Sequence, residues 1–100
     1  PEARLARAAP QLAAATVQRL VAAYGTDALR IAANLGPDLG HGLHEGELRW
    51  MMDREWARTA EDVLWRRSKL GLAFSADEVA ALRARIATMT GRHAGAMAAG

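Results

Sequence analysis

The sequence EWARTAEDVLWRRSKLGL, residues 55–72, contains a clear helix-start signal. Thr59 is followed three residues later by Asp62, which is the spacing of a capping box, although Glu or Gln is more usual at the second of these positions. Asp62 and Arg66 lie four residues apart with the acid first, the order that favours an ion pair along a helix. These residues predict a helix that starts at Thr59 and runs to about Lys69.

A second helix-start signal follows at Ser75, with Glu78 three residues on. The predicted helix has an apolar stripe at helical spacing, formed by Val79, Leu82, Ile86 and Met89. From Gly91 onward, small residues and further glycines predict a frayed tail over residues 91–100.

Three more helices are expected before residue 55. Apolar spacing predicts a helix over residues 10–24 with Pro10 in its first turn and Gly25 after its end, and a short helix over 27–34 capped by Thr26 or Asp27. A glycine-rich loop then leads to a helix with Glu45 and Arg49 four residues apart. One face of this helix carries Leu48, Met51, Met52, Glu55 and Trp56.

No stretch alternates apolar and polar residues over the length of a strand. The sequence therefore predicts an all-α fold, a compact bundle of about five short helices. We expect the domain to span residues 10–90, after an Ala/Arg-rich lead-in at 1–9. Because the chain begins at Pro1 inside this lead-in, we expect it to be a piece of a longer protein.

Composition excludes several classes of protein. The 100 residues contain no cysteine, so disulfides and thiolate metal sites are excluded. No apolar run approaches the roughly 20 residues of a membrane span, so a soluble chain is expected. Thirteen basic and 11 acidic residues give a net charge of +2, which does not demand a nucleic-acid partner.

Residues 55–72 also raise the question of catalysis. Glu61 and Asp62 are adjacent and point about 100° apart on a helix, so they do not form a paired acid and base. We expect no catalytic, cofactor-binding or metal residue in this chain. The structural or interdomain candidates are Glu55, Arg58, Thr59, Glu61, Asp62, Trp65, Arg66, Arg67 and Lys69.

Other residues have two readings. Trp50, Trp56 and Trp65 are expected in the core or at a domain interface, the alternative being stacking on bases or a flavin. A zinc site at His41 and His44 is disfavoured, because the pair lies in a glycine loop without a clear third ligand. The basic cluster of Arg66, Arg67 and Lys69 is expected to be solvated or ion-paired, the alternative being contact with phosphate, nucleic acid or lipid.

A family resemblance adds what spacing alone does not give. Residues 38–72, DLGHGLHEGELRWMMDREWARTAEDVLWRRSKLGL, resemble the C-terminal helical domain of bacterial FAD-dependent, respiratory (aerobic) glycerol-3-phosphate dehydrogenases. GHGL, EWARTAEDVLWRR and KLGL occur in order and without gaps, and LVAAYGTDAL at 20–29 fits an earlier helix of that family. The resemblance covers about residues 16–89. His44 and Ser68 depart from it, where an aromatic residue and threonine are expected.

The resemblance implies a parent enzyme that oxidises sn-glycerol 3-phosphate to dihydroxyacetone phosphate, passes two electrons to FAD and reduces quinone. It implies that the FAD and substrate sites lie in preceding domains of the same polypeptide, so that this chain binds no FAD itself. The parent is expected in the cytoplasm, peripheral on the cytoplasmic face of the inner membrane. The oligomeric state stays open.

The competing class is an independent helical module that binds nucleic acid, a membrane surface or protein. The near-balanced charge and the lack of a recognition helix with clustered polar residues argue against nucleic acid. Acids and arginines flank the modest apolar stripe of the last helix, which argues against a membrane-surface helix.

Overall fold

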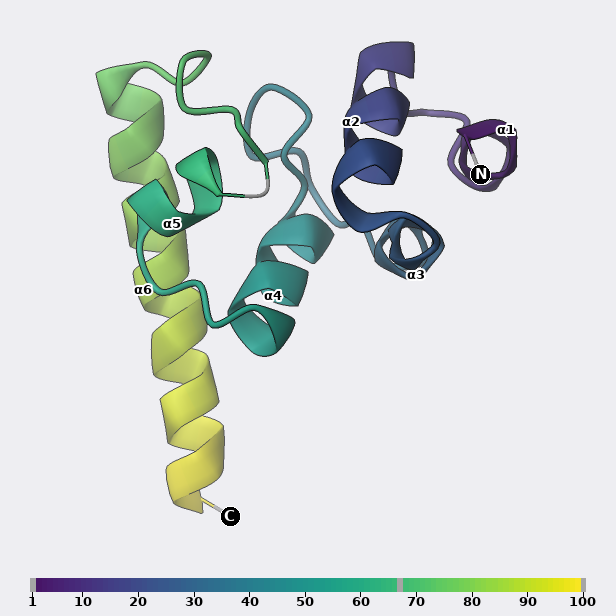
Figure 1. The fold of residues 1–100 in the computed structure, drawn as a ribbon. Helices are drawn as coiled ribbons and strands as arrows, with labels where there is room; N and C mark the ends of the chain where they lie inside the picture. The colour runs from purple at the N-terminus through teal and green to yellow at the C-terminus, as the bar shows by residue number, and fades with distance from the viewer. Residues whose placement is uncertain (1, 67, 100) are drawn as a thin grey trace.

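The computed structural model describes residues 2–66 and 68–99, without the side chains of 92–99 (Figure 1). The described residues form six α-helices and no strand; an isolated bridge joins Asp38 and His44. The helices are α1 (Glu2–Ala8), α2 (Ala14–Tyr24), α3 (Asp27–Ala32), α4 (Glu45–Arg54), α5 (Ala60–Trp65) and α6 (Ala76–Ala99). The predicted all-α fold is confirmed.

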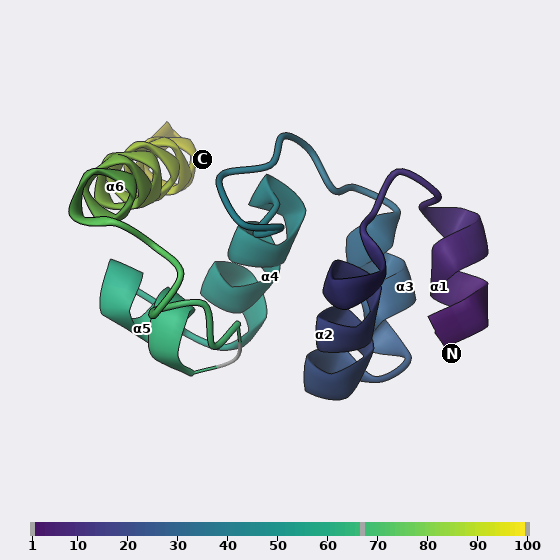
Figure 2. The same ribbon diagram turned by 90° about the horizontal axis from the view of Figure 1, so that it is seen from above.

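The helices divide into two groups, each with its own apolar core. In the first group α1, α2 and α3 pack together around Leu5, Leu20 and Ile31, which are at most 2% exposed. In the second group α4, α5 and α6 contribute to a core that includes Leu48 and Val63. Viewed from above, α4 stands between α5 and α6 on one side and α1 to α3 on the other (Figure 2).

The N-terminal end differs from the sequence prediction. The expected lead-in contains helix α1, whose Leu5 is fully buried in the first core. Periodicity missed this helix because it is seven residues long and has a single large apolar side chain. Helix α2 begins at Ala14 instead of Pro10. The amide of Leu12 donates to the carbonyl of Ala9 in a turn that separates α1 from α2.

Two predicted helix ends also need correction. Thr26 has helical backbone angles and makes no side-chain capping bond at the start of α3, and no such bond from Asp27 is found either. Helix α5 ends at Trp65 instead of near Lys69. The chain turns back there because the Ser68 hydroxyl donates to the carbonyl of Val63 at 2.6 Å and the Gly71 amide donates to that of Leu64 at 3.1 Å.

Helix α6 follows its predicted start and stripe. The Glu78 amide donates to Ser75 Oγ at 3.2 Å, and the Ser75 amide donates to Glu78 Oε1 at 2.8 Å, so the second capping box is confirmed. Leu82 and Ile86 are buried in the second core, with Val79 and Met89 packed against it. The backbone stays helical past Gly91 to Ala99, where a frayed tail was expected; the side chains of 92–100 lie outside the described residues.

Candidate functional site

Asp62 organises the start of α5. Its backbone amide donates to Thr59 Oγ1 at 3.0 Å, and its Oδ2 accepts from the amides of Thr59 at 3.3 Å and Arg58 at 3.1 Å. Its Oδ1 lies 3.3 Å from Arg66 Nη2. The hydrogen bond from the Arg58 amide, followed by that from Thr59, lowers the pKa of Asp62. The predicted capping box and ion pair are both confirmed, and they engage this carboxylate in holding the helix.

Replacing Thr59 by alanine should lower the free energy of unfolding by about 1 kcal/mol, because the Asp62 amide loses its capping oxygen. Thr59→Ser retains that oxygen and is the matched control. Urea denaturation of both variants and the parent chain tests this. Superimposable curves for Thr59→Ala and the parent would contradict the assigned role of the cap.

Arg58 and Glu61 join α5 to its neighbours. Arg58 Nη1 donates to the carbonyls of Met52 at 3.3 Å and Ala57 at 3.0 Å. Its guanidinium also lies over the Trp56 ring, 5.4 Å from the centroid. Glu61 accepts a hydrogen bond from Arg83 of α6, and this bond lowers the pKa of Glu61. Both residues therefore make contacts within the domain, and their structural or interdomain role stays a prediction.

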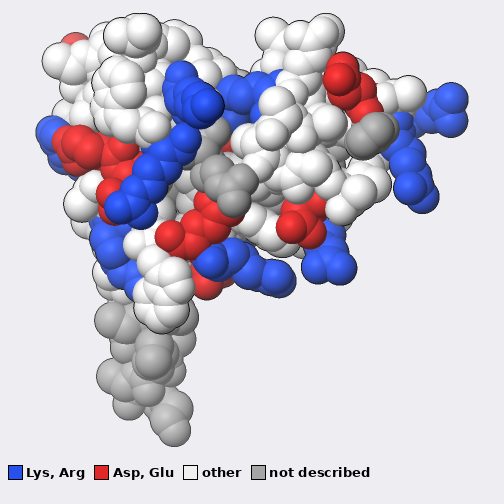
Figure 3. Space-filling view, in the orientation of Figure 1, with Lys and Arg blue, Asp and Glu red and all other residues white. Residues whose placement is uncertain are grey.

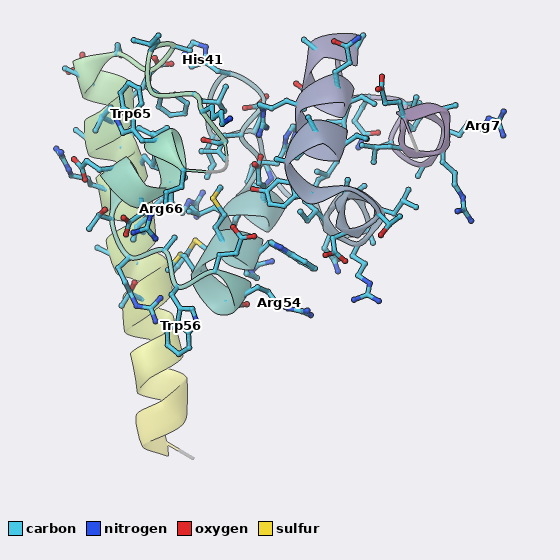
Figure 4. All side chains as sticks on the ribbon, viewed as in Figure 1. Arg7, His41, Arg54, Trp56, Trp65 and Arg66 are labelled. Carbon is cyan, nitrogen blue, oxygen red and sulfur yellow. The ribbon has the colours of Figure 1, made fainter. Side chains whose placement is uncertain are left out.

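The tryptophans differ in their surroundings. Trp50 is partly buried and packs against the first core, with Arg54 4.5 Å from its ring centroid. Trp56 and Trp65 are 75% and 57% exposed, so a place in the core is wrong for both, and a place at a domain interface stays a prediction. Trp56 follows the end of α4 with a positive φ of 61°, which takes it off the predicted apolar face. Figure 4 shows the two exposed rings on the α5 and α6 side of the molecule.

The Trp65 ring packs against Gly71 although it is partly exposed. A Cβ placed on Gly71 would lie 2.3 Å from Trp65 Cε2, so the indole rests directly on the glycine backbone. Beyond it, Leu72 is 93% exposed. The end of α5 and the turn after it thus present two large apolar side chains to solvent, while Ser68 and Gly71 bond back to carbonyls of α5.

A hollow of about 350 Å³ lies between α2 and this turn. Figure 3 shows basic and acidic side chains interspersed over the face of the molecule seen in Figure 1. Arg66 and Lys69 are exposed, and Lys69 has a positive φ of 57°. The predicted candidate Arg67 lies outside the described residues. The lining residues are Arg19, Ala22, Ala23, Arg66, Ser68 and Lys69.

A buried polar cluster joins the two groups of helices. Glu47 of α4 is 1% exposed and accepts from Arg19 Nη1 and Nη2 of α2, both at 2.7 Å. Tyr24 donates its hydroxyl to Glu47 Oε2 at 2.8 Å, and Arg19 Nη2 also donates to the carbonyl of Gly42 at 3.1 Å. Both oxygens of the Glu47 carboxylate therefore accept hydrogen bonds, as a buried charge requires.

The cluster raises the pKa of two of its members, Arg19 and Tyr24. Burial lowers the pKa of Arg19, but the hydrogen bond and charge of Glu47 outweigh it, so the pKa is raised. Burial, the charge of Glu47 and its hydrogen bond raise the pKa of Tyr24, with a smaller contribution from the predicted candidate Glu55. Arg19 stays charged and Tyr24 stays protonated at neutral pH.

Sequence reasoning missed the cluster, although a signal was present. Glu47 lies four residues before Met51 and next to Leu48, within the apolar face of α4. An acid at such a position is rarely buried without a basic partner, so it should prompt a search for one. The partner lies on a separate helix, and its identity depends on the tertiary packing.

The two histidines have ordinary partners. His41 Nε2 lies 2.9 and 3.0 Å from the carboxylate oxygens of Glu78, and its ring packs 5.1 Å from that of Phe74. His44 Nδ1 lies 3.1 Å from the carbonyl oxygen of Gly42. Among the described residues no group of three His, Asp or Glu side chains has the arrangement of a metal site.

Acid should destabilise the chain through three carboxylates. Donor hydrogen bonds lower the pKa of Asp62, Glu61 and Glu78, in the last case from the Ser75 amide and then from His41. A lowered folded pKa means stability that is complete above the ordinary values of 3.8 and 4.5 and is lost as pH falls through the folded pKa values. Melting temperatures measured from pH 6 to pH 2 should decline below about pH 4.5. A flat profile down to pH 2 would contradict these contacts.

The fold and these contacts define a class of protein: a small all-α domain of two helix groups that are joined by a buried ion pair between Arg19 and Glu47. The chain belongs to the family of the C-terminal domain of alpha-glycerophosphate oxidase, whose model matches residues 2–99. None of the described helices combines the length and the apolar character that a membrane crossing needs.

The chain is similar to parts of several larger proteins. It is 38% identical over 82 residues to the aerobic glycerol-3-phosphate dehydrogenase of Escherichia coli K12, covering 76% of this chain and 16% of that protein. It is 48% identical over 58 residues to the glycerol-3-phosphate dehydrogenase of Pseudomonas aeruginosa, covering 52% of this chain and 11% of the relative. Over 66 residues it is 44% identical to the D-erythritol 1-phosphate dehydrogenase of Brucella abortus, covering 63% and 13%. The chain thus spans a small part of these relatives.

Proposed function

We propose that this chain is the C-terminal helical domain of an FAD-dependent glycerol-3-phosphate dehydrogenase, and that it supports the preceding domains without taking part in the chemistry. The parent enzyme oxidises sn-glycerol 3-phosphate to dihydroxyacetone phosphate, with FAD as the first and quinone as the final electron acceptor. It acts in the cytoplasm, peripheral to the cytoplasmic face of the inner membrane.

The observation that carries the structural role is the use of the polar groups in residues 55–72. The Asp62 carboxylate accepts hydrogen bonds from two backbone amides and contacts Arg66. Arg58 donates to two backbone carbonyls, and Glu61 pairs with Arg83. Because a catalytic acid or base must be able to reach a substrate proton, groups held in this way are suited to fixing helices instead.

The glycine-rich loop before α4 does not fit a flavin. Its amides serve the loop itself: Gly40 donates to Asp38 Oδ1 at 2.7 Å, and Leu39 and Leu43 donate to carbonyls within the same loop. In the described residues helix α3, not a strand, precedes the loop, whereas a dinucleotide-binding turn follows a strand. We therefore assign FAD to the preceding domains of the polypeptide.

The relatives support a role that is independent of the particular substrate. Those reported above include proteins named for glycerol 3-phosphate and one named for D-erythritol 1-phosphate, at comparable identity to this chain. A domain that selected the substrate would be expected to diverge between the two. This is consistent with a support for a body that these enzymes share.

The test compares two proteins, this chain alone and the full-length polypeptide that contains it. The full-length protein should show a stoichiometric flavin spectrum and reduce an artificial acceptor with glycerol 3-phosphate. The chain alone should do neither. A flavin spectrum from the purified chain would overturn the supporting role, and a full-length protein without flavin or activity would overturn the assignment of the enzyme.

A further inference from the structure

We propose that the turn after α5 is the docking surface for the preceding domains, and that a carboxylate of those domains enters the hollow beside Lys69. This inference rests on the proposed function, because it names the part of the domain that meets the rest of the polypeptide. It adds a partner of stated chemistry, an Asp or Glu flanked by apolar surface.

The hollow between α2 and the turn is lined by three basic side chains. The side chain of Arg66 is 65% exposed, and its contact with Asp62 at 3.3 Å leaves other guanidinium donors available. Lys69 is exposed and makes no ion pair with any residue in the part of the chain that the structure describes. Arg19 also lines this hollow, and its guanidinium is held in place by Glu47. These three basic residues line one hollow, where an acidic group is the complementary partner.

The same turn also has exposed apolar surface. Trp65 and Leu72 are 57% and 93% exposed, whereas most of the other leucines in the chain are buried. Interfaces between domains combine aromatic anchors with arginine, and Trp65 directly precedes Arg66 in the sequence. The apolar and basic residues belong to one continuous segment, residues 65–72.

Ser68, Lys69 and Gly71 are held in place within the domain before any partner binds. Ser68 is fully buried and its hydroxyl ties the turn to Val63, and the Gly71 backbone supports the Trp65 ring. Lys69 holds a left-handed backbone conformation that is uncommon for a residue with a Cβ, and such conformations persist where their surroundings impose them. A preformed surface loses less conformational entropy on docking.

The size of the relatives identifies the occupant. The matched part of this chain corresponds to 11–16% of the length of the relatives reported above, so most of each relative lies outside the similarity. In a polypeptide of that design the neighbour at high effective concentration is the rest of the same chain. We therefore assign the surface to the preceding domains in preference to a separate protein or a lipid.

The deciding experiment is zero-length cross-linking of the full-length protein in its native state. A carbodiimide joins the Lys69 amine to a carboxylate in direct contact, forming an amide with loss of water, and peptide mass spectrometry identifies both residues. We expect Lys69 to be coupled to an Asp or Glu that precedes residue 1 of this chain. Lys69 left uncoupled, or coupled only within residues 1–100, overturns the proposal.

Hydrogen exchange in the full-length protein provides a second readout. Lys69→Glu should speed amide exchange across residues 66–75 by about tenfold or more, because a charge-assisted contact that protects the segment becomes repulsive. Lys69→Arg keeps the charge and should exchange like the parent. Arg7→Glu makes the same charge change on α1, far from this face (Figure 4), and is the control for net charge. Equal exchange in Lys69→Glu and Arg7→Glu would contradict docking here.

The two proposals fail in different ways. If the full-length protein binds FAD and oxidises glycerol 3-phosphate but Lys69 has no cross-link to the preceding domains, the docking surface is wrong and the function stands. If it has neither flavin nor activity, the proposed function is wrong whatever Lys69 contacts.

Discussion

Replacing Glu47 by alanine should destabilise the chain by about 3–5 kcal/mol, which is the cost of leaving a buried cation without its partner. Arg19 would lose two hydrogen bonds of 2.7 Å and stay charged in a largely buried position, with a side chain only 17% exposed. Tyr24 would lose the acceptor of its buried hydroxyl as well. Since the cluster joins α2 to α4, both groups of helices should loosen together.

Urea denaturation measures this loss, with a double variant as the matched control. Arg19→Met combined with Glu47→Leu removes both charges and keeps apolar volume, so it should be far less destabilised than Glu47→Ala alone. If the single variant does not fold, the double variant still decides the matter by folding. A loss below about 1 kcal/mol for Glu47→Ala would show that the ion pair does not hold the two groups together.

The second large effect is expected at Gly46, where α4 starts against the end of α3. A Cβ at this position would lie 2.0 Å from the carbonyl oxygen of Asn34 and 3.0 Å from the Cα of Leu35. The Gly46 amide also donates to the carbonyl of Leu35 at 2.6 Å. Because the obstacle is backbone, Gly46→Ala forces the two helices apart and should cost at least about 1–3 kcal/mol, the usual range for overpacking.

Gly91→Ala is the control for this substitution. Gly91 lies in α6 with no atom within 4 Å of an added Cβ, so alanine there should stabilise the helix by about 0.4–1 kcal/mol. Opposite signs for the two glycines are therefore expected in parallel melting curves. A neutral result for Gly46→Ala would mean that the contact between α3 and α4 is looser than described.

Local signals in the sequence predicted local structure well. The capping boxes at Thr59 and Ser75 and the ion pair from Asp62 to Arg66 depend on residues within one turn of each other, so spacing alone specifies them. The apolar stripe of α6 was predicted for the same reason. Fold class and family could also be predicted, since the matching motifs lie in order along the chain.

Features that depend on contacts between distant segments could not be predicted in this way. Arg19 and Glu47 are 28 residues apart, and nothing in local spacing pairs them. The end of α5 was misplaced because the turn is set by Ser68 and Gly71 returning to the helix carbonyls. Trp56 follows the apolar spacing of α4, yet the helix ends before it and its backbone turns it outward.

If residues 55–72 support the enzyme and do not bind its substrate, the kinetics of Arg66→Gln in the full-length protein should show it. The variant should have a lower melting temperature, because the contact with Asp62 is lost, and a KM for glycerol 3-phosphate that is nearly unchanged. Loss of a charge-assisted hydrogen bond to the substrate phosphate would instead raise KM by about tenfold or more. Such a rise at an unchanged melting temperature would rule out a purely supporting role and place this domain at the substrate.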